Sequence, residues 1–350
     1  MKKSSIRASM LLAPLALFFL ATISFSGNPD PRISEQRSFN DTAIVSVGAI
    51  LPAADGRSLE IIFNEKAQVL KLSREEKNFA AYNRQFENAL KAKSPLRLVT
   101  DGQRGLLLSV AEPSPRELTY FNDLHKNMLQ AEAARRIDLS AIDTSTFNRV
   151  DEYLKWPVFR SCLKIVPDYA KAKEIFDFCA AQSCHIIGPK QVNPCIPFQY
   201  VKDGCYARAH KMRWIIEKYF GYCSEKVFSF ATEGHHKLAV KADKWGGCCV
   251  EWWYHVTPLI RVRAQAGERS YVLAYVIDPG MFDKPVLLST WLTAQKSTFC
   301  NPNAAVDAYS IQPSTAYTPT YPTGTPYVTD PGYTDTNYWL TAYATLTTCN

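Results

Sequence analysis

The residue best suited to covalent chemistry is Cys205, which follows Asp203 and Gly204 in the run DGCYARAHKM. The Asp-Gly pair predicts a turn, and the residues after it predict a helix to about Tyr219, with Ala209 on the same inward face as Cys205. Backbone N–H groups and the helix dipole in a first turn favour the thiolate, the reactive form of cysteine. The alternative is a disulfide-bonded cysteine that happens to begin a helix, which position alone favours in an exported protein.

A base and a carboxylate follow on two predicted strands. The first strand, residues 249–257, places Trp253 and His255 on one face by the alternation of side chains. A cysteine nucleophile needs such a histidine to take its proton and later to return one. Asp278 ends the second strand, residues 271–277, where it is placed to orient the histidine. The alternatives are a strand histidine with ordinary hydrogen bonds and a turn-initiating Asp before proline.

A cysteine on a helix, followed by histidine and aspartate on successive strands, is the order of papain-like and transglutaminase-like folds. The same segments resemble bacterial protein-glutaminase, a family of secreted enzymes, made with a prodomain, that convert protein-bound glutamine to glutamate. The resemblance extends from about residue 167 to residue 278 and fades in residues 300–350. Its motifs are DGCYARAHKM at 203–212, Cys248-Cys249-Val250 with Trp252, Tyr254-His255-Val256, and Ile277-Asp278-Pro279 with Phe282.

The resemblance implies a role for each predicted site residue. Cys205 is the nucleophile, His255 the base and Asp278 its orienting carboxylate, and residues 27 to about 160 are an inhibitory prodomain. The reaction passes through a Cys thioester and releases ammonia, with the Cys205 backbone N–H helping to hold the oxyanion. Trp253 departs from the family, which more usually has a small polar residue there, so we expect its ring to reshape the substrate groove. Neither a cofactor nor a metal ion is implied.

Other functions stay open from the sequence. A transglutaminase forms the same thioester and passes it to a lysine amine, whereas a cysteine protease cuts the backbone. A disulfide-rich secreted binding module without catalysis would instead have Cys205 in a disulfide. The net charge of +7 is spread along the chain, so the sequence has no one-sided basic segment for nucleic acid.

The N-terminus predicts export. Lys2, Lys3 and Arg7 precede an apolar run from residue 10 to residue 23, and small residues favour cleavage after Ser26. The run is shorter than the ~20 apolar residues of a spanning helix, so a signal peptide over 1–26 is the better interpretation. We therefore expect a secreted protein, extracellular or periplasmic, with no membrane contact after signal cleavage.

The cysteines divide the chain. All ten lie between Cys162 and Cys349, and an oxidising compartment favours disulfides over a metal site for them. If Cys205 is free, nine remain, so one more must be unpaired or bonded to another molecule. Cys248 and Cys249 are adjacent and are not expected to pair with each other, and the sequence therefore predicts that one of these two is the second free cysteine. Cys162 and Cys179 are expected to be additions to the disulfide set of the family.

The cysteine-free half predicts a small α+β unit. Its expected elements are a hairpin of residues 59–63 and 69–72, a helix capped by Ser73 and Glu76 and ending near residue 93, a hairpin of residues 96–100 and 106–110, and a helix from Ser114 to about residue 136. Residues 140–167 have the composition of a linker, in which maturation cleavage is expected between Val150 and Pro167. Residues 301–350 contain no Lys, Arg, Glu or His and predict short strands and turns packed on the main domain.

The predicted fold class is therefore α+β. A small α+β prodomain, residues 27–160, precedes a papain/transglutaminase-like catalytic domain, residues 161–350, in which the Cys-bearing helix packs on an antiparallel sheet that carries the His and the Asp. The expected partners are proteins or peptides with exposed glutamine, the chain's own prodomain and an activating protease. A monomer is expected.

Overall fold

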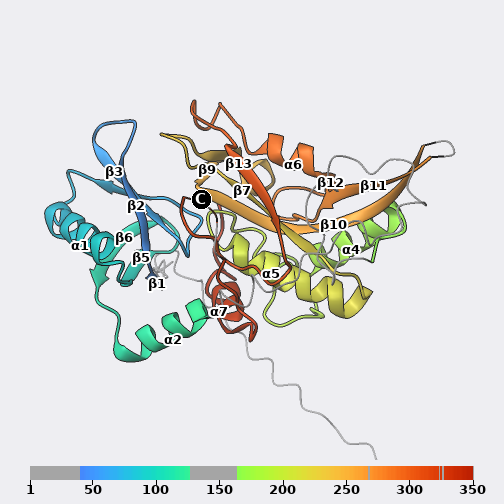
Figure 1. Ribbon diagram of the computed structural model, residues 1–350, viewed down its shortest axis with the longest axis horizontal. Coiled ribbons are helices and arrows are strands. Elements are labelled where there is room, and N and C mark those ends of the chain that lie inside the picture. The colour runs from blue at the N-terminus through green and yellow to red at the C-terminus, as the bar shows by residue number, and fades with distance from the viewer. Residues whose placement is uncertain (1–39, 127–163, 267–268, 323, 325–326, 350) are drawn as a thin grey trace, which may run out of the picture. The chain divides into compact units, whose positions relative to one another are not determined.

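The computed structural model describes residues 40–126, 164–266, 269–322, 324 and 327–349 (Figure 1). The predicted signal peptide, most of the predicted linker and Cys162 lie outside these residues. We call residues 40–126 the N-terminal part and residues 164–349 the C-terminal part.

The N-terminal part consists of two three-stranded antiparallel sheets and two helices. The sheets have the orders β1-β5-β6 and β2-β3-β4, and only Ser46 separates β1 from β2, so the chain passes directly from one sheet to the other. Both predicted hairpins are confirmed. The elements are β1 (Asn40–Val45), β2 (Val47–Pro52), β3 (Ser58–Phe63), β4 (Leu70–Ser73), α1 (Phe79–Ala92), β5 (Leu96–Asp101), β6 (Leu106–Ala111) and α2 (Pro115–Lys126).

The N-termini of α1 and α2 differ in their capping contacts. The predicted capping box of Ser73 and Glu76 is wrong, because α1 begins at Phe79 after Asn78, and Ser73 instead closes a turn with the backbone of Glu76. At α2 the reciprocal contacts do form. The Ser114 hydroxyl accepts from the Glu117 N–H at 3.3 Å, and the Glu117 carboxylate accepts from the Ser114 N–H at 2.8 Å.

The C-terminal part is built on a five-stranded antiparallel sheet with the order β12-β11-β10-β7-β13. Its helices and a smaller two-stranded sheet, β8-β9, surround this sheet. The elements are α4 (Tyr169–Ala181), α5 (Cys205–Ile215), η4 (Ile216–Phe220), β7 (Glu225–Phe230), β8 (Leu238–Lys241), η5 (Asp243–Trp245), β9 (Cys249–Trp252), β10 (Tyr254–Ala266), β11 (Arg269–Val276), β12 (Val286–Leu287), α6 (Leu288–Ala294), β13 (Ala308–Gln312) and α7 (Thr334–Ala342).

Alternating side chains of the central strands enter two different cores. Phe228 of β7 and Ile260 of β10 join the larger cluster, which includes the apolar residues of α5, whereas their neighbours Val227 and Leu259 join a smaller cluster with Trp291 of α6. The helices α5 and α6 therefore cover opposite faces of the sheet, as Figure 1 shows. This confirms the predicted class, a Cys-bearing helix packed on an antiparallel sheet.

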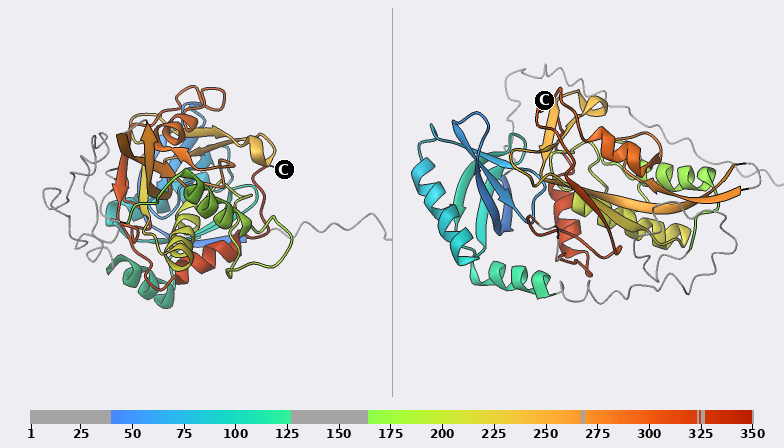
Figure 2. Two further views of the ribbon diagram at one scale, coloured as in Figure 1. Left: turned by 90° about the vertical axis from the view of Figure 1, so that its right-hand side faces the viewer. Right: turned by 45° about the horizontal axis from the view of Figure 1, so that its top comes forward.

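The last fifty residues differ in part from the prediction. A short strand, β13, adds to the edge of the main sheet beside β7, as expected for a packed segment. The helix α7 was not predicted, and it lies beside α5 in both Figures 1 and 2. Its Trp339 and Leu340 are buried. Apolar contact with α5 therefore outweighs the weak helix propensity of a segment rich in Thr and Asn.

Disulfides account for most of the cysteines in the described residues. The bonded pairs are Cys184–Cys195, Cys248–Cys349 and Cys249–Cys300, and Cys223 is disulfide-bonded as well. The prediction that Cys248 or Cys249 is free is therefore wrong. The two are adjacent in sequence, but each is bonded to a different distant cysteine. The free cysteines of the described residues are Cys179 and Cys205, both buried, so the expectation that Cys179 adds to the disulfide set is also wrong.

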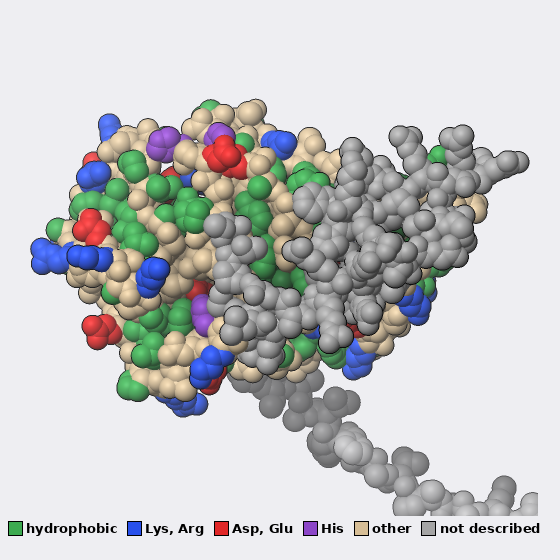
Figure 3. Space-filling model, in the orientation of Figure 1, with side chains coloured by type: hydrophobic (Ala, Val, Ile, Leu, Met, Phe, Trp, Pro, Cys, Tyr) green, Lys and Arg blue, Asp and Glu red, His purple; other side chains and the backbone are tan. Residues whose placement is uncertain are grey.

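The surface of the described residues agrees with the spread of charge along the sequence. On the face in Figure 3, Lys and Arg side chains are scattered among acidic, polar and apolar ones and form no single patch. In the described part of the chain, no helix has both the length and the hydrophobicity that crossing a bilayer requires.

Candidate active site

The position of Cys205 at the start of α5 depends on the preceding glycine. Gly204 is the N-cap and has φ +75°, and a Cβ at this position would lie 2.8 Å from the ring of Tyr343. Only glycine combines this backbone conformation with this close approach. Because α5 begins directly after the turn, Cys205 lies in its first turn as the sequence predicts.

His255 and Asp278 meet at the part of β10 that extends beyond its pairing with β11. The pairing of β10 with β11 ends at Leu259 opposite Val276, while β7 continues along the other side of β10 to Tyr254. The first residues of β10 therefore have no strand on the β11 side. Ile277 and Asp278 turn into this open edge, where the Ile277 N–H donates to the carbonyl of Pro258 at 3.0 Å.

The open edge also receives Cys205. The backbone N–H of Val256 donates to the Cys205 sulfur, so the sulfur lies against the peptide that joins His255 to Val256. On the same side of the strand, His255 Nε2 donates to Asp278 Oδ2 at 2.8 Å. His255 Nδ1 is buried and has no hydrogen-bond partner in the described residues. The structure thus brings all three predicted residues to one end of β10.

Two tryptophans to which the sequence analysis assigned no role, Trp252 and Trp291, hold the imidazole. The ring of Trp252 stacks on His255 with centroids 4.7 Å apart, and Trp291 of α6 lies 5.5 Å away, at a tilt of 26°. Trp291 Nε1 also donates to Asp278 Oδ2 at 3.0 Å. Trp252 and His255 lie on either side of a break at Trp253, where the predicted strand 249–257 divides into β9 and β10. The predicted pairing of Trp253 with His255 on one strand face is therefore wrong.

The electrostatics of Asp278 favour its ionised form. Burial alone would raise the pKa of Asp278, but the charge and hydrogen bond of His255 and the Trp291 N–H outweigh burial and hold the pKa below its ordinary value. The ionised form of Asp278 is therefore favoured beside the imidazole. A carboxylate at Nε2 fixes the ring orientation and leaves Nδ1 as the nitrogen available for proton transfer.

The Cys205 thiol is buried in the uncleaved chain, and its neutral form is favoured. Burial raises the pKa of the Cys205 thiol to about 12, with smaller increases from the Asp203 and Asp278 carboxylates. The Arg208 guanidinium and the Val256 N–H act in the opposite direction. Arg208 lies three residues after Cys205 on α5, a spacing that places both on one side of the helix and that the sequence analysis missed.

A segment of the N-terminal part runs through this region. Between β3 and β4, the Ala67 N–H donates to Asp203 Oδ1 at 3.0 Å, and the Ala67 carbonyl accepts from the Trp253 N–H at 3.1 Å. Gln68 forms an antiparallel bridge with Trp252. Ala67 is fully buried. The Ala67 backbone is therefore hydrogen-bonded on one side to the loop that precedes Cys205 and on the other to the residues that precede His255.

The Trp253 side chain adds further hydrogen bonds to this segment of the N-terminal part. Its indole N–H donates to the carbonyls of Phe63 and Lys66 at 3.0 and 2.8 Å, and its ring is fully buried. The Gln68 side chain is directed elsewhere, because its Nε2 lies 2.8 Å from where a Cβ of Gly105 would be, within the N-terminal part. The buried side chain at the centre of the segment is therefore that of Ala67.

Two histidines outside the site have structural contacts. His210 is buried, and its ring bonds to the Lys226 ammonium and to the carbonyl of Asp330. Burial lowers its pKa well below the ordinary value, with a further contribution from the Lys226 charge. His236 bonds to the Asp307 carboxylate at 2.6 Å. Cys248 and Cys249 are in disulfides, as favoured over metal binding.

A cysteine at a helix N-terminus, beside a strand whose histidine is hydrogen-bonded to a carboxylate, is the arrangement found in papain-like and transglutaminase-like folds. The family described as Glutaminase matches residues 172–295, which include all three residues of the site. The chain belongs to the bacterial protein-glutaminase family. This confirms the family that the sequence motifs predict.

Solved structures extend the likeness to the N-terminal part. The crystal structure of pro-protein-glutaminase is 25% identical, with a TM-score of 0.60 over 89% of this chain and 96% of that chain. The A47Q2 mutant of pro-protein-glutaminase is 25% identical, with a TM-score of 0.58 over 87% and 95%. The NMR structure of protein-glutaminase from Chryseobacterium proteolyticum is 33% identical, with a TM-score of 0.45 over 53% and 92%. Among curated proteins, none matches this chain.

Proposed function

We propose that this chain is the precursor of a secreted protein-glutaminase, in which Cys205, His255 and Asp278 deamidate glutamine side chains of proteins. The observation that supports the assignment is the arrangement at the open edge of β10. There the Cys205 sulfur lies against the peptide after His255, and the imidazole has one nitrogen bonded to Asp278 and the other without a partner in the described residues.

In the proposed reaction, His255 Nδ1 takes the thiol proton and the Cys205 thiolate attacks the carboxamide carbon of glutamine. First-turn N–H groups of α5, that of Cys205 among them, stabilise the oxyanion. The imidazolium returns its proton to the departing ammonia, which leaves a thioester. His255 then activates water, which hydrolyses the thioester to a glutamate side chain and restores the thiol. Asp278 stabilises the imidazolium in both half-reactions.

The N-terminal part acts in this proposal as an inhibitory prodomain, spanning residues 27–160 after a signal peptide of residues 1–26. Its Lys66–Gln68 segment occupies the place of a substrate backbone, and its alanine offers no amide for attack. In this proposal the segment contributes to the burial that raises the pKa of Cys205. Once a protease cleaves between residues 150 and 167 and the prodomain leaves, water reaches the thiol and Arg208, the Val256 N–H and the helix dipole then favour the thiolate.

Four observations support export. The N-terminal residues have the pattern of a signal peptide, Cys248–Cys349 and Cys249–Cys300 are disulfides, and Cys184–Cys195 is a third. Such bonds persist in oxidising compartments and are rare in the cytosol. We propose release to the periplasm or to the medium.

The test is ammonia release from casein by the processed enzyme. Cys205→Ala is expected to abolish release while the fold, measured by circular dichroism, stays intact. Cys179→Ala is the matched control, because Cys179 is the other free and buried thiol, and this variant is expected to retain activity. Activity in the processed Cys205→Ala variant would refute the assignment.

The same assay separates the other enzymes that form a Cys thioester. Ammonia with neither crosslinked casein nor new fragments is the outcome expected of a deamidase. Crosslinks would indicate acyl transfer to lysine, and fragments would indicate peptide-bond hydrolysis. Both are read from one denaturing gel of the assay mixture.

A further inference from the structure

The Lys66 side chain, one residue before Ala67, is held by an unusually complete set of contacts. Its Nζ lies 2.7 Å from Asp41 Oδ2 and 3.0 Å from Asp203 Oδ2, donates to the Tyr343 hydroxyl at 3.2 Å, and lies 4.8 Å from the centroid of the Trp339 ring. Only 6% of the side chain is exposed. Burial would lower the pKa of Lys66, but the two carboxylates outweigh burial and raise it, so the ammonium stays charged.

These contacts divide between the two parts of the chain. Asp41 and Lys66 belong to the N-terminal part, whereas Asp203, Trp339 and Tyr343 belong to the C-terminal part. When the prodomain leaves, the carboxylate of Asp203 loses the ammonium of Lys66 at Oδ2 and the Ala67 N–H at Oδ1, and it keeps the Tyr343 hydroxyl at 3.0 Å.

Among the described residues of the C-terminal part, no side chain replaces the Lys66 ammonium beside Asp203. Arg208 lies close by, but its guanidinium donates to the carbonyl oxygens of Tyr200 and Asp203 at 2.7 and 2.6 Å rather than to the Asp203 carboxylate. A carboxylate beside two aromatic faces, with a hydroxyl that supports it, is a recognition site for a cationic side chain.

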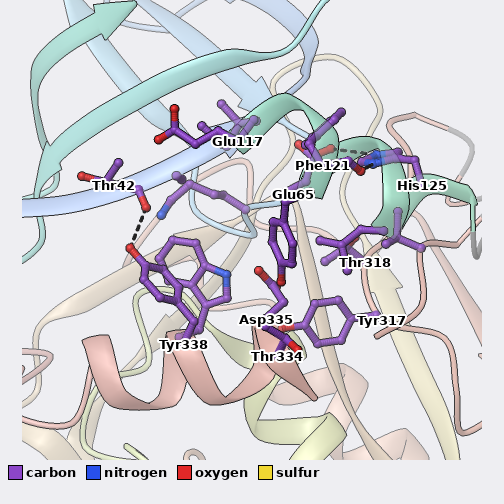
Figure 4. A pocket seen from close by; sticks show the side chains of 18 residues that line it. Thr42, Glu65, Glu117, Phe121, His125, Tyr317, Thr318, Thr334, Asp335 and Tyr338 are labelled. Atoms are coloured by element: carbon purple, nitrogen blue, oxygen red, sulfur yellow. Dashed lines mark hydrogen bonds and ion pairs between the residues drawn. The ribbon is translucent and has the colours of Figure 1, made fainter. Parts of the chain in front are cut away.

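Space for such a side chain continues beyond Lys66. A cavity of about 280 Å³ borders Lys66 and Trp339, and Tyr317, Asp335 and Tyr338 line the same cavity from the C-terminal part (Figure 4). Burial raises the pKa of Asp335 to about 7, with a smaller contribution from the charge of Asp330. The wall lined by Thr42, Glu117 and Phe121 leaves with the prodomain, and the wall that the C-terminal part keeps presents aromatic rings and a second acidic group to whatever extends past the position of Lys66.

We propose that Asp203, Tyr343 and Trp339 form a substrate subsite for the side chain of lysine or arginine in the residue immediately before the target glutamine. This rests on the proposed function, and on a substrate backbone that follows the path of Lys66–Gln68, with glutamine at the position of Ala67. Asp203 then has two tasks: one oxygen accepts the N–H of the glutamine and the other pairs with the preceding cation. A glutamate before the glutamine is disfavoured by repulsion from Asp203.

The experiment measures ammonia release by processed enzyme from blocked peptides Ala-Xaa-Gln-Ala-Gly. With Xaa as lysine, kcat/KM is expected to exceed that for methionine, which has similar length and no charge, by about tenfold, the order of a charge-assisted hydrogen bond. Acetyl-lysine is expected to behave as methionine does, and glutamate to be poorer than both. The acetyl-lysine peptide tests the charge in the unaltered enzyme.

Variants assign the effect to Asp203. In Asp203→Asn the amide oxygen still accepts the backbone N–H, so the ratio of lysine to methionine is expected to fall toward one, whatever happens to the absolute rate. Asp177→Asn on α4 removes an exposed carboxylate paired with Lys173 and is expected to keep the ratio. Comparing ratios within one enzyme removes general losses of activity from the result.

The outcomes separate the two proposals. Equal kcat/KM for the lysine, methionine and glutamate peptides would overturn the subsite while leaving the deamidase function in place. Absence of ammonia from every glutamine peptide and from casein would overturn the function, and with it the subsite. A lysine preference that survives in Asp203→Asn would also overturn the subsite as assigned.

Discussion

Replacing Lys66 by methionine in the unprocessed chain is expected to loosen the prodomain. Lys66 bridges Asp41 of the N-terminal part and Asp203 of the C-terminal part, and the exposed fractions of these side chains are 6%, 4% and 1%. Methionine keeps much of the apolar stem and removes the charge. The two carboxylates then face each other without a cation between them, across the contact that the proposal requires for inhibition.

The magnitude follows from the two distances. Contacts of 2.7 and 3.0 Å to one nitrogen limit the separation of the two carboxylate oxygens to 5.7 Å. At an effective dielectric constant of about 20, repulsion at this separation is about 3 kcal/mol. This agrees with the ~3–5 kcal/mol cost of removing one partner of a buried ion pair. Since about 1.4 kcal/mol is a factor of ten, the open state of the prodomain should become about a hundredfold more populated.

The assay is the rate of iodoacetamide labelling of Cys205 at pH 8. Burial raises the pKa of this thiol to about 12 in the closed chain, so labelling requires opening and its rate follows the open population. Peptide mass mapping separates Cys205 from Cys179, the other free thiol. Lys66→Met is expected to label about a hundredfold faster than the unaltered chain.

The matched control is Lys71→Met. Lys71 also pairs across the two parts, with Glu251 at 3.5 Å, but 57% of its side chain is exposed. Exposed pairs contribute about 0–1 kcal/mol, so labelling should rise by less than about fivefold. If Lys66→Met is folded and labels no faster than Lys71→Met, the buried bridge does not hold the prodomain and the reasoning is refuted.

Three further predictions concern the same chain. Alkylation of the denatured, unreduced protein is expected to label Cys179 and Cys205, and mass spectrometry that finds Cys205 in a disulfide would contradict the site. Asp278→Asn is expected to lower kcat by about a thousandfold or more in the processed enzyme with the fold retained, because the histidine loses the carboxylate that sets its tautomer and stabilises its cation; ammonia release measures this, and near-normal turnover would contradict it. Because burial raises the pKa of Asp335 to about 7, the folded chain binds its proton more tightly than the unfolded chain does, and this contribution to stability declines as pH rises from about 4 to 7. Asp335→Asn should therefore gain in melting temperature relative to the unaltered chain between pH 5 and pH 8, by about 2 °C or more, and a constant difference would show that Asp335 does not titrate there.

The local features of the site were predictable because each depends on neighbours in the sequence. The turn before Cys205 follows from Asp-Gly, and the strand that carries His255 follows from its aromatic and β-branched residues. The aspartate after an apolar strand marks where that strand must end. These signals also place the three residues in an order that resembles a known family, and the comparisons confirm that family.

The errors in the disulfides and in the last fifty residues came from contacts between distant segments. The sequence contains no signal that Cys248 and Cys249 bond to Cys349 and Cys300, because disulfide pairing depends on which loops meet in space. Trp291 reaches Asp278 only because α6 covers the sheet face opposite α5. The helix α7 forms in a segment of poor helix propensity because its apolar side chains are buried, a tertiary effect that local patterns do not contain.

By itself, the sequence determined the order and type of most elements, the position of Cys205 in a first helical turn, and the succession of cysteine, histidine and aspartate. Only the tertiary structure decided that β11 stops short of β10 and leaves an edge where these residues meet, and that Lys66 crosses from the N-terminal part to the carboxylate of Asp203. Propensity and periodicity act over a few residues, whereas burial and ion pairing depend on which surfaces the whole chain brings together.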